Sequence, residues 1–283
     1  MPSHRIRIVT DTAATLPPEF VRTHEINVVP QIIVFGQETF FENVTLSFDE
    51  FLVRLKSSAM LPKTSAPQPG DLIQAYRSQL EDADTILSIH PSSDVSGTVR
   101  SAMTAKNTTF PDADIRIIDS RTAGGNLASM VIAAVEWAEQ GIGADEIVKR
   151  VDAMIPRGRV YFLVATLEYL QRGGRIGGAA ALIGTALQIK PILELKAGRV
   201  EAFEKVRTHH RALERLKELV LEQCPPSADA HLCILQADVQ NAAEQLAAEL
   251  RGKLGIKNIP IYPCGASITT HVGPGTLGVA FFV

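Results

Sequence analysis

The sequence predicts an α/β protein with an N-terminal parallel-sheet domain flanked by helices and a C-terminal α+β domain with a mixed sheet. Strand and helix patterns alternate through the first half, which is typical of parallel strands joined by helices. From about Val160 the rhythm changes, and a hairpin pattern appears among the helices. We therefore expect two domains, residues 1–160 and 161–283. No repeat or low-complexity linker separates them, which predicts that they are tightly joined.

In the first half, buried strands are expected to alternate with helices. Ser47 and Glu50 form a capping-box pattern that predicts a helix to about Lys56. Thr64–Gly70 is predicted to be a loop because it holds two prolines and a glycine. The other expected elements are strands over 5–10, 27–35, 85–89 and 115–119 and helices over 71–80, 96–107 and 127–140.

Parallel sheets bind ligands beyond the carboxyl ends of their strands. Asp11, the loop 92–98 and Ser120 each follow such a strand end. We therefore expect these residues to lie along one rim of the N-terminal sheet.

The second half mixes strands, helices and one hairpin. A strand over Tyr161–Val164 precedes a helical turn over Leu167–Gln171, which ends at two glycines. Ala197 and Gly198 separate two strand patterns and predict the hairpin turn. The other expected elements are strands over 192–196, 199–203, 230–235, 259–262 and 278–283 and helices over 209–223 and 239–253.

Composition is that of an ordinary globular protein, with 46% hydrophobic and 21% charged residues. A net charge of −3 gives no reason to expect a nucleic-acid partner. Three cysteines without C-x-x-C spacing argue against a disulfide framework or a zinc site and fit a reducing cytoplasm. No signal-peptide pattern precedes the first strand, and the most apolar run, 176–189, is too short to span a bilayer. We expect a cytoplasmic protein without stable membrane insertion.

The segment 85–101 gives the strongest indication of chemistry. An apolar strand runs into a loop of hydroxyl residues, and Ser96, Gly97 and Thr98 then open a helix pattern. A helix start presents unpaired backbone N–H groups and attracts an anion. The segment lacks the lysine of a Walker A loop and the glycines of G-x-S-x-G, so it favours a small anionic group. The same residues would also serve as an ordinary helix cap.

Further polar residues lie in loops braced by glycine or proline. Thr64 and Ser65 begin the proline-rich loop, and His271 lies in a glycine- and proline-rich turn between two expected strands. Two hydroxyls and an imidazole can cradle a carboxylate, which offers about four acceptor sites. Arg175 follows two glycines, and Arg207 follows a strand pattern. Ordinary roles stay open for each residue: turn closure for the hydroxyls, a structural histidine, and surface ion pairs for the arginines.

The apolar run 177–189 is rich in alanine, glycine and leucine and has two interpretations. Small side chains allow helices to pack closely, which is their commoner use. They also suit the wall of a narrow channel for an alkyl chain. Each buried methylene is worth about 0.8 kcal/mol, so a long acyl chain would gain roughly 10 kcal/mol before ordering costs. A hydroxyl-lined anion site beside such a channel suits a fatty acid.

Two alternative functions use the same residues. A serine esterase or thioesterase would pair Ser96 with His271, although the nucleophile-elbow glycines are missing. Its acidic member would have to be Asp11, Asp94 or Asp119. A nucleotide or phosphate binder is disfavoured by the missing lysine and by the lack of G-x-G-x-x-G. The seven histidines show no metal-binding spacing, so we expect no metal and no cofactor.

Eight segments occur in one order along the chain: TDTAATLP (10–17), KTSAPQPG (63–70), SSDVSGT (92–98), IDS (118–120), LEYLQRGGRI (167–176), IKPI (189–192), KVR (205–207) and THVGPG (270–275). Together they resemble the DegV family of bacterial fatty-acid-binding proteins, from Ile6 to Phe282. Each segment alone is a weak signal, but eight in order are specific.

The resemblance implies a lipid held between the two domains, with its acyl tail in the interior. The carboxylate would be bound by Thr64 and Ser96, with His271 in the same hydrogen-bond network. We expect Gly97, which adjoins Ser96, to belong to this carboxylate site as well. The protein would then be a monomeric carrier whose ligand is a long-chain fatty acid, and would itself catalyse no reaction.

The resemblance also implies a protein partner. Family members of the FakB type present the carboxylate to a separate fatty-acid kinase, and the arginines that match Arg175 and Arg207 are associated with the exposed carboxylate and with kinase docking. This chain departs from the common pattern at Ala66 and Gln68, and at Asp94-Val95 in place of Gly-Leu. We expect Asp94 to face solvent, because an inward carboxylate would repel the ligand.

Overall fold

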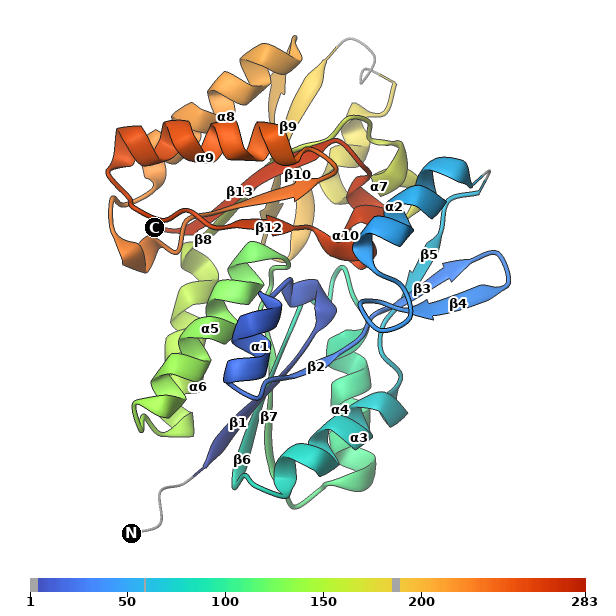
Figure 1. Cartoon of the computed structure of the whole chain (residues 1–283), viewed down its shortest axis with the longest axis vertical. Coiled ribbons are helices and arrows are strands. Elements are labelled where there is room, and N and C mark those ends of the chain that lie inside the picture. Colours follow the sequence, from blue (N-terminus) through green and yellow to red (C-terminus); the bar gives the residue numbers. More distant parts are fainter. Residues whose placement is uncertain (1–4, 59, 185–188) are drawn as a thin grey trace.

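The computed structural model describes residues 5–58, 60–184 and 189–283, and each half of the chain is built on its own sheet (Figure 1). A four-stranded parallel sheet in the N-terminal half has the order β2-β1-β6-β7, and a six-stranded mixed sheet in the C-terminal half has the order β10-β9-β8-β13-β11-β12. The predicted fold class is confirmed. The boundary expected at 160/161 falls inside β8 (Gly158–Leu163), and the division at that point stays a prediction.

The parallel sheet is covered by helices on both faces because its strands are apolar on both sides. Ile8 and Leu87 pack with the helices α5 and α6, whereas Val9 and Ile86 turn the other way and pack with α3 and α4. The elements are β1 (Ile6–Asp11), β2 (Asn27–Val29), β6 (Thr85–His90), β7 (Asp114–Asp119), α1 (Pro18–Thr23), α3 (Pro69–Leu80), α4 (Thr98–Thr109), α5 (Gly125–Glu139), α6 (Ala144–Met154) and the 3₁₀ turn η1 (Thr12–Ala14). Helices α1 and α6 were not predicted.

The single strand predicted over 27–35 is wrong, because the run divides between two sheets. Residues 27–29 form β2, and Ile32–Phe35 form β3 of a separate antiparallel sheet with the order β4-β3-β5. Pro30 separates them, since proline has no N–H to donate to a continuing ladder. The small sheet projects to one side with α2 (Phe48–Ser57) across it, and Ser47 and Glu50 form the predicted capping box.

The loop predicted over 64–70 is also wrong at both ends. Lys63–Ser65 form β5, in which Thr64 pairs with Ile33 of β3. Pro69 is the first residue of α3, where the missing N–H costs nothing. The small sheet also contains β4 (Glu38–Phe41), which the sequence pattern did not indicate.

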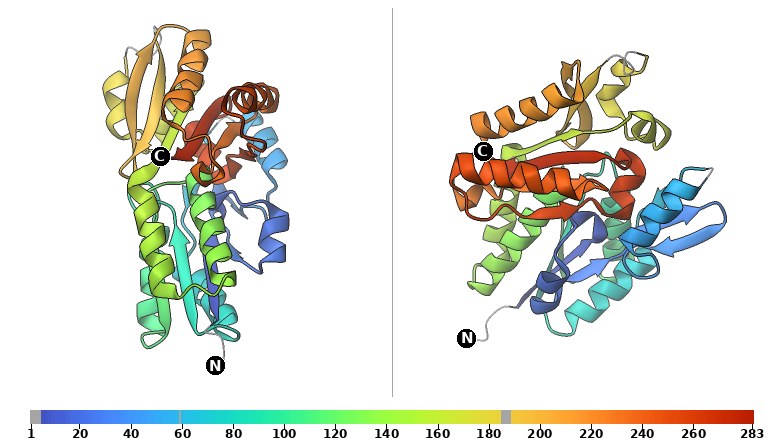
Figure 2. Two further views of the ribbon diagram at one scale, coloured as in Figure 1. Left: turned by 90° about the vertical axis from the view of Figure 1, so that its left-hand side faces the viewer. Right: turned by 45° about the horizontal axis from the view of Figure 1, so that its top comes forward.

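The mixed sheet has one face covered by helices and the other turned toward the N-terminal half (Figures 1 and 2). Helices α8 and α9 pack on the outer face with a core that includes Leu216, Leu246 and Phe281. The predicted hairpin is confirmed as β9 and β10, joined at Ala197-Gly198. The elements are β8, β9 (Lys190–Lys196), β10 (Arg199–Val206), β11 (Cys233–Ala237), β12 (Ile261–Pro263), β13 (Thr276–Phe282), α7 (Glu168–Arg172), α8 (His209–Gln223), α9 (Gln240–Leu254), α10 (Gly265–Val272), η2 (Ile155–Arg157), η3 (Gly177–Leu182) and η4 (Ala228–Ala230).

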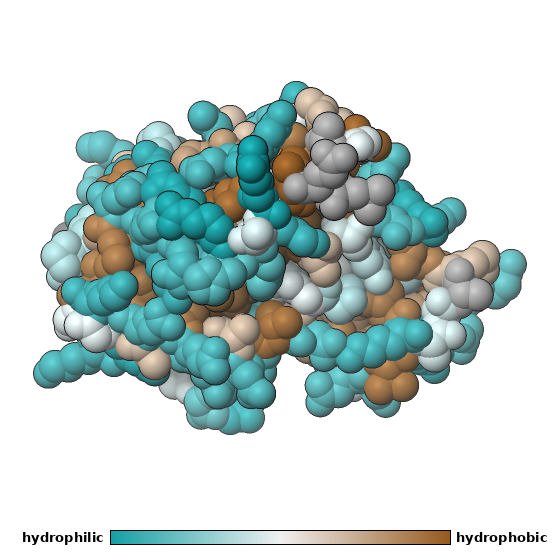
Figure 3. Space-filling model, turned by 90° about the horizontal axis from the view of Figure 1, so that it is seen from above, coloured by the Kyte–Doolittle hydropathy of each residue, from teal (hydrophilic) through white to brown (hydrophobic). Residues whose placement is uncertain are grey.

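The surface seen from above is mainly hydrophilic, with hydrophobic side chains in separate patches (Figure 3). Part of this polar cover comes from α8, where Arg215 pairs with Glu204, Glu218 and Glu222.

Candidate functional site

An apolar cavity of about 1040 Å³, including its open mouth, lies between the two halves of the chain. The mixed sheet supplies much of its wall with the side chains of Val160, Phe162, Leu195, Val200 and Leu235. The N-terminal half contributes Ala13, Gln31, Thr64, Ala66, Pro91, Val95, Ser96, Gly97, Ala123 and Gly124, and α10 contributes Ser267, Ile268, His271 and Val272.

An outer groove of about 990 Å³, including its open mouth, adjoins the cavity at a polar neck. Thr64, Arg175 and His271 line both spaces and form this neck, where the two spaces adjoin. The groove adds Lys63 and Arg172, whereas the inner cavity is walled mostly by apolar side chains. The arrangement suits an amphiphile whose apolar part lies inside and whose polar end reaches the neck.

Two residues far apart in the sequence meet at this neck. Thr64 is in β5, and its Oγ1 lies 2.8 Å from Nε2 of His271. His271 was expected in a turn between strands, which is wrong: it occupies the last turn of α10, and Gly273 ends that helix with a φ of 80°. A glycine is required there because a side chain would need left-handed backbone and would collide with the Tyr169 ring.

His271 is neutral at physiological pH. Burial lowers its pKa to about 4, and the positive charge of Arg175 acts in the same direction. Nδ1 of His271 is buried without a hydrogen-bond partner among the described residues. Buried N–H groups without a partner are rarer in folded proteins than bare acceptors, which favours the tautomer with the proton on Nε2. Nε2–H then donates to Thr64, and the Thr64 hydroxyl proton is left for a ligand.

The loop 92–98 brings Ser96 and Gly97 to the same cavity. Helix α4 begins at Thr98 rather than at Ser96, with Gly97 as its N-cap. The Ser96 Oγ lies 2.8 Å from the Thr98 Oγ1 and accepts the Thr98 backbone N–H at 3.3 Å. Both hydroxyl-bearing residues proposed from the sequence, Thr64 and Ser96, therefore line one cavity.

The two arginines lie in different surroundings. Arg175 is half-buried at the neck, where its Nε donates to the Val95 carbonyl at 3.0 Å and Nη1 to the Gly173 carbonyl at 2.8 Å. It thus ties the loop 92–98 to the C-terminal half. Arg207 is exposed just after β10 and lines neither the cavity nor the groove.

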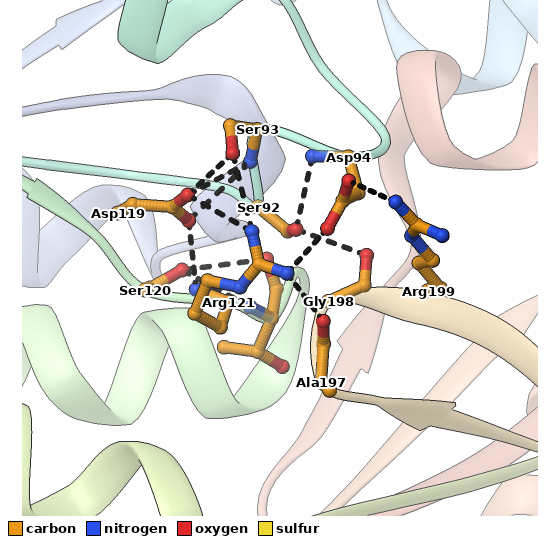
Figure 4. A network of polar contacts seen from close by, with 10 residues as sticks. Ser92, Ser93, Asp94, Asp119, Ser120, Arg121, Ala197, Gly198 and Arg199 are labelled. Atoms are coloured by element: carbon orange, nitrogen blue, oxygen red, sulfur yellow. Dashed lines mark hydrogen bonds and ion pairs between the residues drawn. The ribbon is translucent and has the colours of Figure 1, made fainter.

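The carboxylate of Asp94 points to the outside of the loop, as expected. It pairs with Arg199 and Arg121, whose hydrogen bonds lower its pKa (Figure 4). Arg121 also donates to the Ala197 carbonyl, and the Ser92 Oγ donates to the Gly198 carbonyl at 2.9 Å. This polar network, which comprises residues 92–94, 119–121 and 197–199, holds the turn of the hairpin β9–β10 against the loop 92–98.

A serine-hydrolase triad is not assembled in the part of the chain that the structure describes. Ser96 bonds to Thr98, and His271 bonds to Thr64, so the proposed nucleophile and base serve different partners. The second nitrogen of His271 meets no carboxylate. The arrangement therefore lacks the nucleophile–base contact that acyl transfer requires.

The apolar run 177–189 does not line the cavity in its described part. Residues 177–182 form η3, and a Cβ on Gly177 would lie 2.1 Å from the Val200 carbonyl oxygen. Close packing, the alternative use of small residues, is seen at Gly177 and at the buried Ala179 and Leu182, whereas Ile183 and Gly184 are exposed. Residues 185–188 lie outside the described residues.

The sequence did not indicate the buried residues that hydrogen-bond behind Ser96. Gln31 lines the cavity and bonds to Thr98, and Asp11 lies behind it with His90. A lone glutamine after a proline in an apolar run was a usable signal, because a buried polar side chain needs partners.

Over residues 5–58, 60–184 and 189–283, no helix has the length and apolar character needed to cross a bilayer. Within the same residues no group of three or more His, Cys, Asp or Glu side chains is placed to hold a metal ion.

These features define a two-domain α/β protein with an interdomain cavity that is apolar inside and polar at its mouth. The chain belongs to the DegV family: the family model described as "Uncharacterised protein, DegV family" matches residues 5–283. A DegV domain-containing protein of Streptomyces coelicolor is 36% identical over 279 residues, which cover 98% of each chain.

Solved structures extend the likeness to the whole fold. A structure described as fatty acid binding of a DegV family protein from Thermus thermophilus has a TM-score of 0.92 and 33% identity, covering 98% of this chain and 99% of that one. The structure of DegV, a fatty acid binding protein from Bacillus subtilis, has a TM-score of 0.88 and 33% identity, covering 99% and 100%.

Proposed function

We propose that this protein binds a long-chain fatty acid, with the acyl chain in the cavity and the carboxylate at Thr64, Ser96, Gly97 and His271. The observation that carries this proposal is the polar neck, where Thr64, Arg175 and His271 border a mainly apolar cavity. Relatives whose structures are described as fatty-acid-binding support it. The protein is then a carrier in the cytoplasm, active as a monomer, with the fatty acid as its ligand and no cofactor.

The chemistry of the two spaces suits the two ends of such a ligand. Each methylene taken from water gains about 0.8 kcal/mol, and the apolar wall accepts many of them. The carboxylate has about four acceptor sites and no donor, so it matches hydroxyl groups whose protons are free. Because His271 is neutral, the nearby positive charge at the neck is that of Arg175.

The mouth also leaves the carboxylate accessible to a second protein. The groove outside the neck carries Lys63 and Arg172 beside Arg175. A fatty-acid kinase that brings ATP and Mg²⁺ would transfer the γ-phosphoryl group to a carboxylate oxygen, giving the acyl phosphate and ADP. In this proposal Arg175 faces the kinase at the mouth, and the exposed Arg207 contributes to docking.

Ligand binding is tested by extracting the purified protein and identifying the lipid by mass spectrometry, then by calorimetric titration of the delipidated protein. The double variant T64A/S96A should weaken fatty-acid binding, by about 1.5–3 kcal/mol for each hydroxyl lost to a charged acceptor. Binding of a hydrocarbon of equal length should change little. The control S57A/T104A removes two exposed hydroxyls that bond only to backbone carbonyls. A lipid-free protein that binds no long-chain acid refutes the proposal.

The kinase role has its own test. Loaded protein is mixed with a purified fatty-acid kinase, ATP and Mg²⁺, and the acyl phosphate is trapped with hydroxylamine. R207A should slow product formation while fatty-acid affinity stays unchanged. Failure of the loaded wild-type protein to yield product refutes the carrier role and leaves binding intact.

A further inference from the structure

The Ser96 hydroxyl is the last member of a buried hydrogen-bond chain that begins at Asp11. Asp11 and His90 are fully buried, and the Asp11 carboxylate accepts from three groups: the Ala13 N–H at 3.0 Å, the Gln31 Nε2 at 2.9 Å and the His90 Nδ1 at 2.8 Å. A carboxylate bonded in this way has only acceptor sites, so every partner must donate to it. The orientation of the Gln31 amide follows, with its NH₂ group toward Asp11.

Because Asp11 only accepts hydrogen bonds, the donor and acceptor roles at Thr98 are fixed as well. The second N–H of the Gln31 Nε2 points to the Thr98 Oγ1 at 3.0 Å, so Thr98 accepts there. Thr98 is fully buried, and the Ser96 Oγ is the other partner recorded for its hydroxyl. If Ser96 donated to Thr98, the Thr98 proton would be left without an acceptor among the described residues, at a cost that folded proteins avoid. Thr98 therefore donates to Ser96.

Ser96 is thus left with one proton and one free direction. Its Oγ already accepts from the Thr98 hydroxyl and from the Thr98 backbone N–H. Ser96 lines the cavity, so its hydroxyl proton is available to a ligand bound there. Gln31 itself is held rigidly, because its backbone N–H donates to Thr12 and its carbonyl accepts from Glu42.

We infer that Gln31, set by Asp11 and acting through Thr98, is a positioning residue that makes the cavity select headgroups able only to accept hydrogen bonds. This inference rests on the proposed function and specifies the ligand class further. An ionised carboxylate satisfies the Ser96 and Thr64 protons together. A primary amide of the same shape has one acceptor oxygen in place of two, so its NH₂ group takes the position of the second carboxylate oxygen and cannot accept the proton offered there.

The test compares the affinities of palmitate and palmitamide, which share one chain and one headgroup shape. The wild-type protein should prefer the acid. In Q31M the hydrogen bonds from Asp11 to Ser96 lose their fixed direction, so the Ser96 hydroxyl can turn and accept. The ratio of acid affinity to amide affinity should then fall about tenfold, which is the effect of one charged hydrogen bond. T98V should show the same fall. T98S, which keeps the hydroxyl, should retain the wild-type ratio.

Q236M is the matched control. Gln236 is also buried, bonds to Val239 and Gln240, and lines neither space, so its loss should leave the ratio unchanged. A second readout is the ¹³C signal of bound [1-¹³C]palmitate followed over pH. A donor aimed at the carboxylate lowers the pKa of the bound acid, so this pKa should rise by about one unit in Q31M.

Failure takes two distinguishable forms. If the wild-type protein does not bind palmitate, the proposed function is wrong and this inference is wrong with it. If the wild-type protein binds palmitate but Q31M and T98V keep both its ratio and its ¹³C titration, only the inference is overturned. Equal loss of ratio in T98S and T98V would likewise overturn it, because the loss would then come from packing.

Discussion

The hydroxyl groups of Ser96 and Thr64 both line the cavity, but they rest on different supports. Behind Ser96 stands a buried chain drawn entirely from the N-terminal half, in which Asp11 is surrounded by donors. Behind Thr64 stands a single imidazole from the C-terminal half, one of whose nitrogens has no partner in the described part of the chain. The hydrogen bonds behind Ser96 all lie within one domain, whereas the bond between Thr64 and His271 joins the two domains.

The difference shows how one binding site can join a fixed and an adjustable element. The Ser96 support cannot rearrange without leaving several buried polar groups unpaired, which is costly. The Thr64 support depends on one bond and on a group that changes charge in acid. We expect the first to contribute mainly to stability and selectivity and the second to make the site sensitive to pH.

The largest effect is expected from D11A. Removing the carboxylate leaves the donors of Ala13, Gln31 and His90 without an acceptor in a fully buried site. The free energy of unfolding should fall by about 3–5 kcal/mol, measured by denaturant titration. The control variant D112A removes an exposed aspartate and should change the free energy of unfolding by less than about 0.5 kcal/mol.

If D11A does not accumulate as folded protein, D11N provides the measurement, because the amide keeps one acceptor oxygen. An intermediate loss is then expected. A loss below about 1 kcal/mol in D11A would mean that the Ser96 support is no firmer than an ordinary surface contact.

A smaller effect, dependent on pH, is expected at the Thr64 support. The pKa of His271 is about 4 in the folded protein and 6.5 in its unperturbed state. Between these values the unfolded chain binds a proton that the folded protein does not, so stability is lost as the pH falls from about 6.5 to 4. The full loss is about 3 kcal/mol, and H271Q should lack it.

The measurement is the unfolding free energy of the ligand-free wild-type protein and of H271Q across this pH range. Burial raises the pKa of Glu42 and gives an opposite slope, since folding then favours its protonated form, but this contribution is common to both proteins and cancels in the difference. Parallel pH profiles would show that His271 is not the group that makes the site sensitive to acid.

Local sequence patterns were sufficient to predict much of the fold. The capping box at Ser47, the hairpin turn at Ala197-Gly198 and the alternating strands and helices depend on neighbours a few residues apart, and each was predicted correctly. The strand over 27–35 failed because partner choice across sheets is not local. Nothing within that run tells that Ile33 pairs with Thr64.

The candidate site shows the same contrast between local signals, which the sequence reveals, and long-range contacts, which it does not. Thr64, Ser96 and His271 could be singled out by residue type and by resemblance, but the contact between Thr64 and His271 spans 207 positions. It depends on how β5 and α10 are brought together by the two sheets. Gln31 has no motif of its own, and its importance follows from burial and from the direction of its hydrogen bonds.

The smallest effect is expected where the loop carrying Ser96 is held from outside. D94N removes the charge that pairs with Arg121 and Arg199, while the bond from Ser92 to the Gly198 carbonyl remains. These ion pairs are partly exposed to solvent and screened by salt, so the unfolding free energy should fall by less than about 1 kcal/mol, and raising the salt concentration should shrink the difference. Denaturant titrations of D94N and wild-type protein at low and high salt measure the loss in unfolding free energy and its dependence on salt. A loss approaching that of D11A would reverse the comparison, because the outer ion pairs and not the buried chain would then hold the Ser96 loop in place.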